Sequence, residues 1–323
     1  MKKVFLLSGE NLELAQAEIL ALTKRKPKNW ELIDNVIISN ANFKLARLAL
    51  TKKVYEYLFQ STSKNINKKM EKYNWNKAYK KNFSLRISNV GHIKFYEKEA
   101  QLAKHIWNQI KEPRVDLKQA VTKFELVITE KKILGGKILH EPKNDYKLRR
   151  PHLRPAPCPT SLSPKLARAC INLTGIQTGK TLCDPFCGSG GILLEAGLMR
   201  FKTIGYDVDK NLLKSAKKNL DYYKIKGYSL DERDSTKLCE SVDYVVTDLP
   251  YGKSSKITDS LKRLYFDFLT SLSENLKYKA VVIFPDFIDH KKIIKKTSLV
   301  IEKEFSWYVH RSLTRNIVLL NTT

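Results

Sequence analysis

Residues 181–196, TLCDPFCGSGGILLEA, constrain the fold of this chain more than any other stretch. A short apolar run that predicts a strand is followed by a turn with three glycines and then by apolar residues at helical spacing. Strand, glycine-rich turn and helix form the opening unit of a doubly wound α/β domain, where ligands bind at the carboxyl end of the sheet. Glycine permits positive φ and lets a ligand lie against bare backbone. We therefore expect a ligand-binding α/β domain around this turn.

The glycine spacing restricts the ligand. A dinucleotide fingerprint requires G-x-G-x-x-G, whereas Leu193 stands where the third glycine would be. Asp207 follows at the end of the next apolar stretch, and a carboxylate at that place suits a ribose diol. A cofactor with a ribose but no pyrophosphate fits this pattern best, and S-adenosylmethionine is such a cofactor.

A second motif follows the apolar residues 244–247 and consists of Asp248, Leu249, Pro250 and Tyr251. The exocyclic amine of a base is a poor nucleophile because its lone pair is delocalised into the ring. A carboxylate and a backbone carbonyl that accept hydrogen bonds from this amine favour the pyramidal form that attacks a sulfonium, and Tyr251 would stack on the base. Alone, such a segment is more often a turn that closes a strand. Together with the glycine turn it predicts methylation of a base amine.

Three segments carry a resemblance to a known family. Residues 184–199 resemble the cofactor loop of the archaeal tRNA guanine-N2 methyltransferases that act on nucleotide 10 of tRNA, and residues 247–255 resemble their catalytic loop. Arg154-Pro155 and residues 161–168 resemble the segment that leads into their catalytic domain. The resemblance is close from about residue 139 onward and only general before it. Leu249 stands where the family usually has proline, which leaves the carbonyl acceptor but removes the stiffness that proline gives the backbone.

The motifs and the resemblance together imply two sets of site residues. The expected catalytic residues are Asp248, Leu249, Pro250 and Tyr251. The expected cofactor-binding residues are Asp184, Phe186, Cys187, Gly188, Gly190, Asp207, Val208, Asp234, Ser235, Thr160 and Ser161. The resemblance makes Asp234 the acceptor for the adenine amino group, with a capping role as the alternative. Thr160 and Ser161 would lie beside the methionine end of the cofactor, with a helix cap as an equal alternative.

Charge and cysteine content restrict the partners. The formal net charge of +26 indicates a polyanionic partner, although part of this excess can reflect a lysine-rich composition.

The five cysteines form no C-x-x-C pair, so we expect small apolar side chains in a reducing compartment and no metal site. No apolar run approaches the roughly 20 residues of a membrane span, and residues 1–10 do not form a signal peptide. We therefore expect a cytoplasmic protein without a membrane segment.

The chain is expected to consist of four parts. Residues 1–60 form an α+β module of ferredoxin-like type, and residues 61–145 resemble a THUMP-type RNA-binding domain, which implies docking onto the acceptor end of tRNA. Residues 146–159 are rich in proline and arginine and predict an extended linker whose arginines could contact phosphate. Residues 160–323 form the S-adenosylmethionine-dependent methyltransferase domain, an α/β Rossmann-like class I fold.

Periodicity predicts individual elements in the N-terminal parts. We expect strands over 3–7, 32–38 and 83–90, helices over 11–23, 43–59 and 98–110, and a hairpin of 121–129 with 133–139. The lysine-rich residues 61–82 contain Tyr73, Trp75 and Tyr79. These rings either face RNA or pack into a neighbouring core, and the sequence does not decide between the two.

In the methyltransferase domain, strands are expected over 181–186, 203–208, 228–233, 244–248 and 280–285. Residues 299–309 and 315–321 predict an antiparallel hairpin that closes the sheet, as in Rossmann-like methyltransferases. A dehydrogenase would not usually end its sheet in this way.

These expectations lead to one functional hypothesis with alternatives. The protein is expected to methylate the N2 amine of a guanosine in tRNA, at nucleotide 10, with one or two methyl groups from S-adenosylmethionine. Another guanine N2 or an adenine N6 in tRNA or rRNA is the alternative within this chemistry. A non-catalytic RNA-binding protein with a decayed methyltransferase domain is the alternative outside it. A small activating protein partner is left open.

Overall fold

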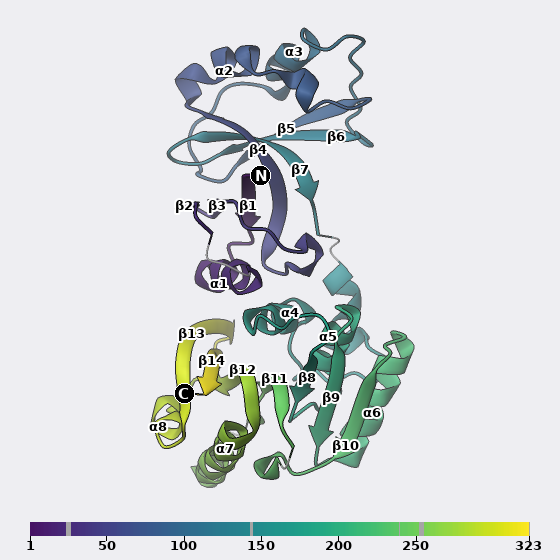
Figure 1. The fold of residues 1–323 in the computed structure, drawn as a ribbon, viewed down its shortest axis with the longest axis vertical. Coiled ribbons are helices and arrows are strands. Elements are labelled where there is room, and N and C mark those ends of the chain that lie inside the picture. The colour runs from purple at the N-terminus through teal and green to yellow at the C-terminus, as the bar shows by residue number, and fades with distance from the viewer. Residues whose placement is uncertain (24–26, 143–144, 239, 252–254, 323) are drawn as a thin grey trace. The chain divides into compact units, whose positions relative to one another are not determined.

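The computed structural model describes residues 1–23, 27–142, 145–238, 240–251 and 255–322, with the backbone alone for 255–258 (Figure 1). The chain divides into two compact units. The N-terminal unit comprises Met1–Gln16, Thr23–Ala46 and Leu50–Lys143. The C-terminal unit comprises Asn144–Thr323 together with Ala17–Leu22 and Arg47–Ala49. Each unit contains one seven-stranded sheet.

The sheet of the N-terminal unit has the order β2-β3-β1-β4-β7-β6-β5. Its neighbouring strands are antiparallel except for the parallel pair β5 and β6. The strands are β1 (Lys3–Leu7), β2 (Trp30–Ile33), β3 (Val36–Ser39), β4 (Thr51–Ser61), β5 (Phe83–Asn89), β6 (Thr122–Ile128) and β7 (Ile133–His140). Because β4 pairs with both β1 and β7, strands from the predicted modules 1–60 and 61–145 belong to one sheet.

The helix predicted over residues 43–59 is wrong. A short 3-10 turn, Leu45–Arg47, is followed by β4, whose β-branched and aromatic side chains favour a strand. Strand β4 forms hydrogen bonds with a neighbouring strand on each of its edges, and these bonds outweigh the weak helical periodicity of residues 43–59. The strand predicted over 32–38 is also wrong, since β2 and β3 form a hairpin there. Asp34 makes the turn with a φ of 52°, which aspartate tolerates better than most residues.

Among the described residues, α2 (Ile66–Lys72) and α3 (Glu99–Trp107) belong to this unit, whereas α1 (Leu12–Leu22) is divided between the two units. Residues of α2, α3 and the sheet enclose Trp75, which is 1% exposed and donates from Nε1 to the Met70 carbonyl at 2.8 Å. Tyr73 and Tyr79 pack against the same cluster. The rings of residues 61–82 therefore belong to the core. The strand predicted over 83–90 and the hairpin of β6 and β7 are confirmed.

The sheet of the C-terminal unit has the order β10-β9-β8-β11-β12-β14-β13. The strands are β8 (Thr181–Asp184), β9 (Lys202–Asp207), β10 (Tyr228–Glu232), β11 (Val242–Asp248), β12 (Leu276–Pro285), β13 (Leu299–His310) and β14 (Leu313–Thr322). Strands β8 to β12 are parallel, and β14 is antiparallel to β12 and β13. This confirms the predicted fold. The strand order reverses between β8 and β11, where such sheets bind ligands.

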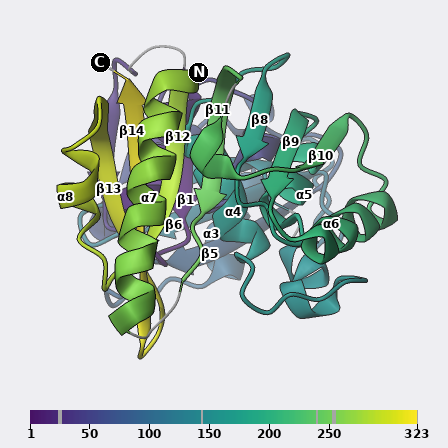
Figure 2. The same ribbon diagram turned by 90° about the horizontal axis from the view of Figure 1, so that it is seen from below.

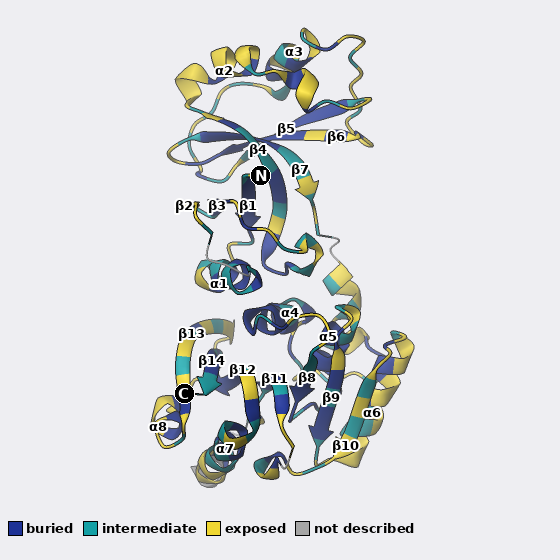
Figure 3. Ribbon diagram, viewed as in Figure 1, coloured by how far each residue is buried: buried dark blue, intermediate teal, exposed yellow. Residues whose placement is uncertain are grey.

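Helices cover both faces of this sheet. Figures 1 and 2 show α7 on one face and α4 and α5 on the other, while Figure 3 shows most of β8 buried. The helices are α4 (Pro164–Leu173), α5 (Gly191–Leu198), α6 (Lys210–Tyr222), α7 (Ser255–Asn275) and α8 (His290–Ile294). Tyr265 and Phe268 of α7 are fully buried against β11 and β12.

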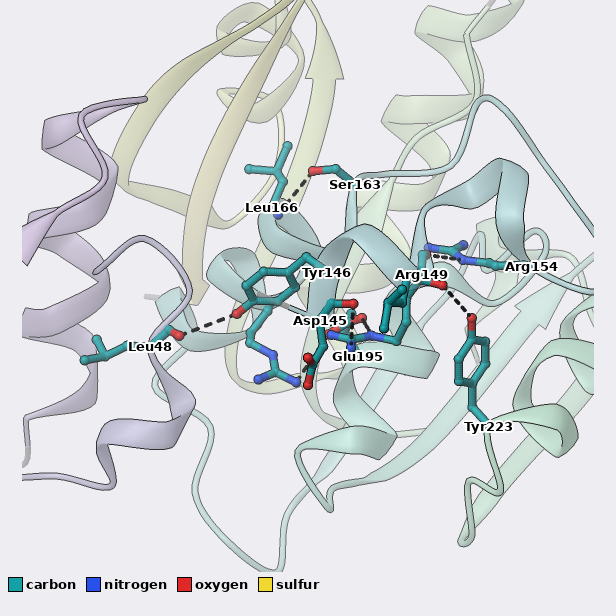
Figure 4. Close-up of polar contacts among 11 residues, drawn as sticks. Leu48, Asp145, Tyr146, Arg149, Arg154, Ser163, Leu166, Glu195 and Tyr223 are labelled. Atoms are coloured by element: carbon teal, nitrogen blue, oxygen red, sulfur yellow. Dashed lines mark hydrogen bonds and ion pairs between the residues drawn. The ribbon is translucent and has the colours of Figure 1, made fainter. Parts of the chain in front are cut away.

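The segment expected to be an extended linker forms two 3-10 turns, Asp145–Arg149 and Pro151–Leu153. Arg149 pairs with the fully buried Glu195 of α5 through Nε at 2.8 Å and Nη2 at 3.2 Å (Figure 4). Arg154 is buried and donates from Nε to the Arg149 carbonyl. These two arginines stabilise the C-terminal unit internally, so they are not the phosphate contacts that the sequence suggested.

Candidate functional site

The carboxyl ends of β8, β9 and β11 open into a cavity of about 340 Å³, which we call the sheet-end cavity. Its lining includes most of the predicted site residues, namely Thr160, Ser161, Asp184, Phe186, Cys187, Gly188, Asp207, Val208, Asp234, Ser235, Asp248 and Pro250. Gly190, Leu249 and Tyr251 are not part of the lining, whereas Gly191 is. Residues predicted from separate stretches of sequence therefore meet at one edge of the sheet.

The glycine turn begins α5 and is braced by Asp207. Gly188 and Gly190 have φ values of 51° and 81°, in the left-handed region that glycine adopts at little cost. The Gly188 amide donates to Oδ2 of Asp207 at 2.9 Å, and the Asp209 amide donates to Oδ1 at 3.0 Å. Each carboxylate oxygen can accept a second hydrogen bond. Asp207 therefore positions the turn and still has acceptor capacity toward the cavity.

Asp184 is a buried carboxyl at the end of β8. Its Oδ1 accepts from Thr247 Oγ1 at 2.8 Å and from the Phe186 amide at 3.3 Å. Burial raises the pKa of Asp184 to about 7, and the nearby carboxylates of Asp248 and Asp207 contribute to the rise. Asp184 thus ties the end of β8 to the end of β11.

Asp234 performs the capping role that the sequence left open. Its Oδ1 accepts from the Thr236 amide at 2.9 Å and from Thr236 Oγ1 at 2.8 Å, and these bonds lower the pKa of Asp234. Ser235 is buried and donates from Oγ to the Pro185 carbonyl. The exposed Asp234 carboxylate lies at the cavity, so capping and ligand binding are compatible.

The helix cap proposed as an alternative for Thr160 and Ser161 is wrong. Ser163 caps α4, because its Oγ accepts from the Leu166 amide at 3.3 Å (Figure 4). Ser161 instead approaches Ser189 of the glycine turn, with 3.1 Å between the two Oγ atoms. Ser161 therefore lies beside the glycine turn, and both Thr160 and Ser161 line the sheet-end cavity.

The second motif occupies the end of β11. Asp248 Oδ2 accepts from Arg315 Nη2 at 3.1 Å, and Oδ1 accepts from the Tyr251 hydroxyl. Burial raises the pKa of Asp248 to about 7, while Arg315 opposes the rise. The Tyr265 hydroxyl donates to the Pro250 carbonyl at 2.6 Å. The loop is thus held at Asp248 and at Pro250, and Leu249 between them is buried.

Sequence reasoning missed Arg315, which lies 67 residues after Asp248, near the start of β14 in the closing hairpin. The signal was present but ambiguous. Arg315 stands two residues before the apolar run 317–320, near the start of an expected strand, and many exposed strands begin in the same way.

Two negative findings apply to the described part of the chain. No helix in it is long and apolar enough to cross a membrane. It also contains no group of three or more His, Cys, Asp or Glu side chains that could hold a metal ion.

Comparison with known proteins identifies the family. A family model described as an RMKL-like methyltransferase domain matches residues 151–317, which include the whole sheet-end cavity. A second family model, described as a DNA methylase, matches residues 3–218. Among solved structures, TrmN from Thermus thermophilus aligns over 100% of both chains with a TM-score of 0.56 and 16% identity. A putative methyltransferase complexed with SAH has a TM-score of 0.53 and 13% identity. These likenesses show the fold.

Curated relatives are more similar in sequence. The tRNA (guanine(10)-N2)-dimethyltransferase of Methanothermobacter thermautotrophicus is 31% identical over 335 residues, which cover 98% of each chain. The enzyme of the same name from Pyrococcus abyssi is 31% identical over 64% of each chain. A tRNA (guanine(6)-N2)-methyltransferase of Methanocaldococcus jannaschii is 26% identical over 49% of this chain. Because the first similarity extends over nearly the whole length, the chain belongs to the tRNA (guanine(10)-N2)-dimethyltransferase family.

Proposed function

We propose that this protein transfers methyl groups from S-adenosylmethionine to the N2 amine of guanosine 10 in tRNA. The observation that carries the proposal is the meeting of the glycine turn and the Asp248 loop at one cavity. The full-length similarity to enzymes named for this reaction supports the same substrate. We expect N2,N2-dimethylguanosine as the end product, because those relatives are named dimethyltransferases.

The sheet-end cavity is the proposed cofactor site. Its volume of about 340 Å³ lies within the range of small-molecule sites, roughly 300–1,000 Å³. Its lining contains four aspartates and one arginine, which suits a cofactor that carries a sulfonium and an ammonium group. Asp207 would accept hydrogen bonds from the ribose hydroxyls, Asp234 and Ser235 would bind the adenine, and Thr160 and Ser161 would lie at the methionine end.

Asp248 is the proposed acceptor for the guanine amine. The carboxylate and the Leu249 carbonyl would accept hydrogen bonds from its two N–H groups, so that the nitrogen lone pair points at the methyl group. Bound S-adenosylmethionine supplies that methyl group from its sulfonium. A carboxyl whose pKa is about 7 can take the amine proton once the N–C bond has begun to form. Tyr251 would hold the base by stacking.

The N-terminal unit is the proposed tRNA-binding part. It contains a groove of about 440 Å³, which we call the lysine groove. Its lining residues are Gln60, Ser61, Thr62, Asn65, Lys68, Lys69, Lys72 and Lys132. Lys132 is paired with Glu31 at 2.7 Å, so we assign phosphate contact to the three lysines of α2. Ammonium groups bind phosphate as point charges, without selecting sequence.

Nucleoside mass spectrometry of an unmodified tRNA transcript tests the function. Incubation with the protein and S-adenosylmethionine should convert guanosine 10 to its N2-methyl forms. A transcript with adenosine at position 10 is the matched control and should remain unmethylated. Methylation of another guanosine, or N6-methyladenosine in the control, would favour the alternative substrates. If the protein does not bind the cofactor and transfers no methyl group, the alternative of a non-catalytic RNA-binding protein is correct.

A further inference from the structure

Arg315 connects two parts of the candidate site that are far apart in sequence. Its Nη2 donates to Asp248 Oδ2 at 3.1 Å and to the Thr160 carbonyl at 3.2 Å. Its Nε donates to the Tyr251 hydroxyl at 3.0 Å. The side chain is 8% exposed. One guanidinium thus contacts both ends of the motif at β11 and the segment beside the glycine turn.

The strand that carries Arg315 makes this arrangement rigid. Arg315 stands opposite Pro285 in a ladder that joins β12 and β14 over seven residue pairs. The neighbouring strand β11 pairs with β12 and carries Asp248 at its end. Two strands of one continuous sheet therefore set the distance between Arg315 and Asp248. A functional group on such an element is held more precisely than one on a loop.

The contacts also leave room for a substrate. A carboxylate offers about four acceptor positions, and Arg315 and Tyr251 use one on each oxygen. The guanidinium carbon of Arg315 lies over the Tyr251 ring, 5.7 Å from its centroid. Arg315 therefore contacts both the hydroxyl and the ring of Tyr251 and holds this side chain in place.

Because Asp248 is largely buried, its carboxylate needs a partner such as Arg315. A buried carboxylate without a partner is costly, and loss of one member of such a pair destabilises far more than the pair stabilises. The planar fork of arginine can bind several acceptors at fixed angles, whereas the ammonium group of lysine acts as a single point. Arg315 thus suits a position where a carboxylate, a hydroxyl and a carbonyl must be held together.

We propose that Arg315 is the positioning residue that aligns the base-binding motif, Asp248 and Tyr251, with the cofactor side of the site at Thr160. This inference rests on the proposed function. Arg315 acts through Asp248 and Tyr251 and does not touch the reacting atoms. Its loss should therefore lower the rate of methyl transfer in the bound complex more than it weakens binding of either substrate.

Single-turnover methyl transfer at saturating cofactor and tRNA tests the alignment. Arg315→Ala should lower the rate about 100-fold, the scale of an ångström-sized misplacement. KM for tRNA and Kd for the cofactor should change by less than about threefold. Arg315→Lys should recover part of the rate, because it keeps the charge but not the fork. Arg311→Ala removes an exposed arginine from the adjacent turn and should match wild type. A wild-type rate for Arg315→Ala, or a change confined to KM, would overturn the proposal.

A stability measurement separates this inference from the proposed function. Arg315→Ala should lower the midpoint of thermal unfolding at pH 8 more in the wild-type background than in the Asp248→Asn background, because only the former leaves a buried charge unpaired. Equal shifts in the two backgrounds would mean that Arg315 does not hold the carboxylate, and the proposal would fail. If this coupling is found and wild-type protein methylates no tRNA, the proposed function fails and the pairing stands.

Discussion

The lysine groove and the sheet-end cavity have opposite charge in a chain whose formal net charge is +26. Four lysines and no acidic residue are among the described lining residues of the groove. Four aspartates and one arginine are among those of the cavity. The net charge therefore indicates a polyanionic partner for the protein as a whole, but it has the opposite sign to the charge of the proposed cofactor site. The lysine groove and the sheet-end cavity each carry the charge that attracts their own proposed ligand.

The lysine groove and the sheet-end cavity also differ in how far their charged side chains are buried. The three groove lysines of α2 are exposed, so solvent screens their charges and their loss leaves the fold intact. Asp184 and Asp248 lie at the ends of central strands, and burial raises the pKa of both. We therefore expect groove substitutions to change tRNA affinity and its salt dependence. Cavity substitutions should change methyl transfer, cofactor affinity or stability, depending on the residue.

The largest effect is expected for Asp248→Ala. Removal of a preorganised acceptor costs roughly 3–4 kcal/mol, or two to three decades in rate. Asp248→Asn keeps an acceptor oxygen without the charge and should retain a low residual rate. Single-turnover transfer measures both variants, and cofactor affinity should hardly change. Near-wild-type transfer by the alanine variant would show that other groups hold the amine.

The next largest effect concerns Asp207, whose loss should weaken cofactor binding and leave tRNA affinity unchanged. Hydrogen bonds to a charged group contribute about 1.5–3 kcal/mol, so Asp207→Ala should weaken S-adenosylmethionine binding by one to two decades. Calorimetry measures this affinity, and the tRNA affinity of the same variant is the control. Unchanged cofactor affinity would assign the ribose to another residue.

The groove is tested by the triple variant Lys68→Ala, Lys69→Ala and Lys72→Ala. We expect about a tenfold loss of tRNA affinity and a reduction of the salt slope by about 1 for each lost phosphate contact. Filter binding over a range of salt concentrations measures both. Cofactor affinity should not change.

The matched control for the groove replaces Lys104, Lys111 and Lys118, three exposed lysines of the same unit, with alanine. It changes net charge by the same amount. If this control loses as much affinity as the groove variant, charge alone attracts the tRNA and the groove is not a specific contact.

The last prediction is a pH-dependent gain of stability in Asp184→Asn. The pKa of Asp184 is about 7 in the folded protein, against an ordinary 3.8. Between these values the folded state binds more protons than the unfolded state, so stability falls as the pH rises. Asparagine does not titrate, so the variant should gain stability over wild type from about pH 4 to pH 7 and keep that gain above. Urea unfolding at pH 5 and pH 8 measures it, and a difference independent of pH would contradict the burial of this charge.

Local motifs predicted the C-terminal unit better than the N-terminal unit. The turn at Gly188 and the acid at Asp207 were recognised because one strand, one turn and one helix are contiguous in sequence. The parallel order then follows from alternating strands and helices. In the N-terminal unit, residues 43–59 were assigned to a helix although most of them form β4. The reason is that β4 depends on β1 and β7, which come from distant parts of the chain.

The methyltransferase fold, the cavity carboxylates and the Asp248 motif could be predicted from the sequence, because each is marked by local patterns of a strand and the turn after it. Three features became visible only in the folded chain: Trp75 belongs to a core, Arg149 pairs with Glu195, and Arg315 reaches Asp248. Ion pairs and burial depend on which side chains meet after the sheets have formed. Residues separated by 46 or 67 positions leave no local pattern from which that meeting could be predicted.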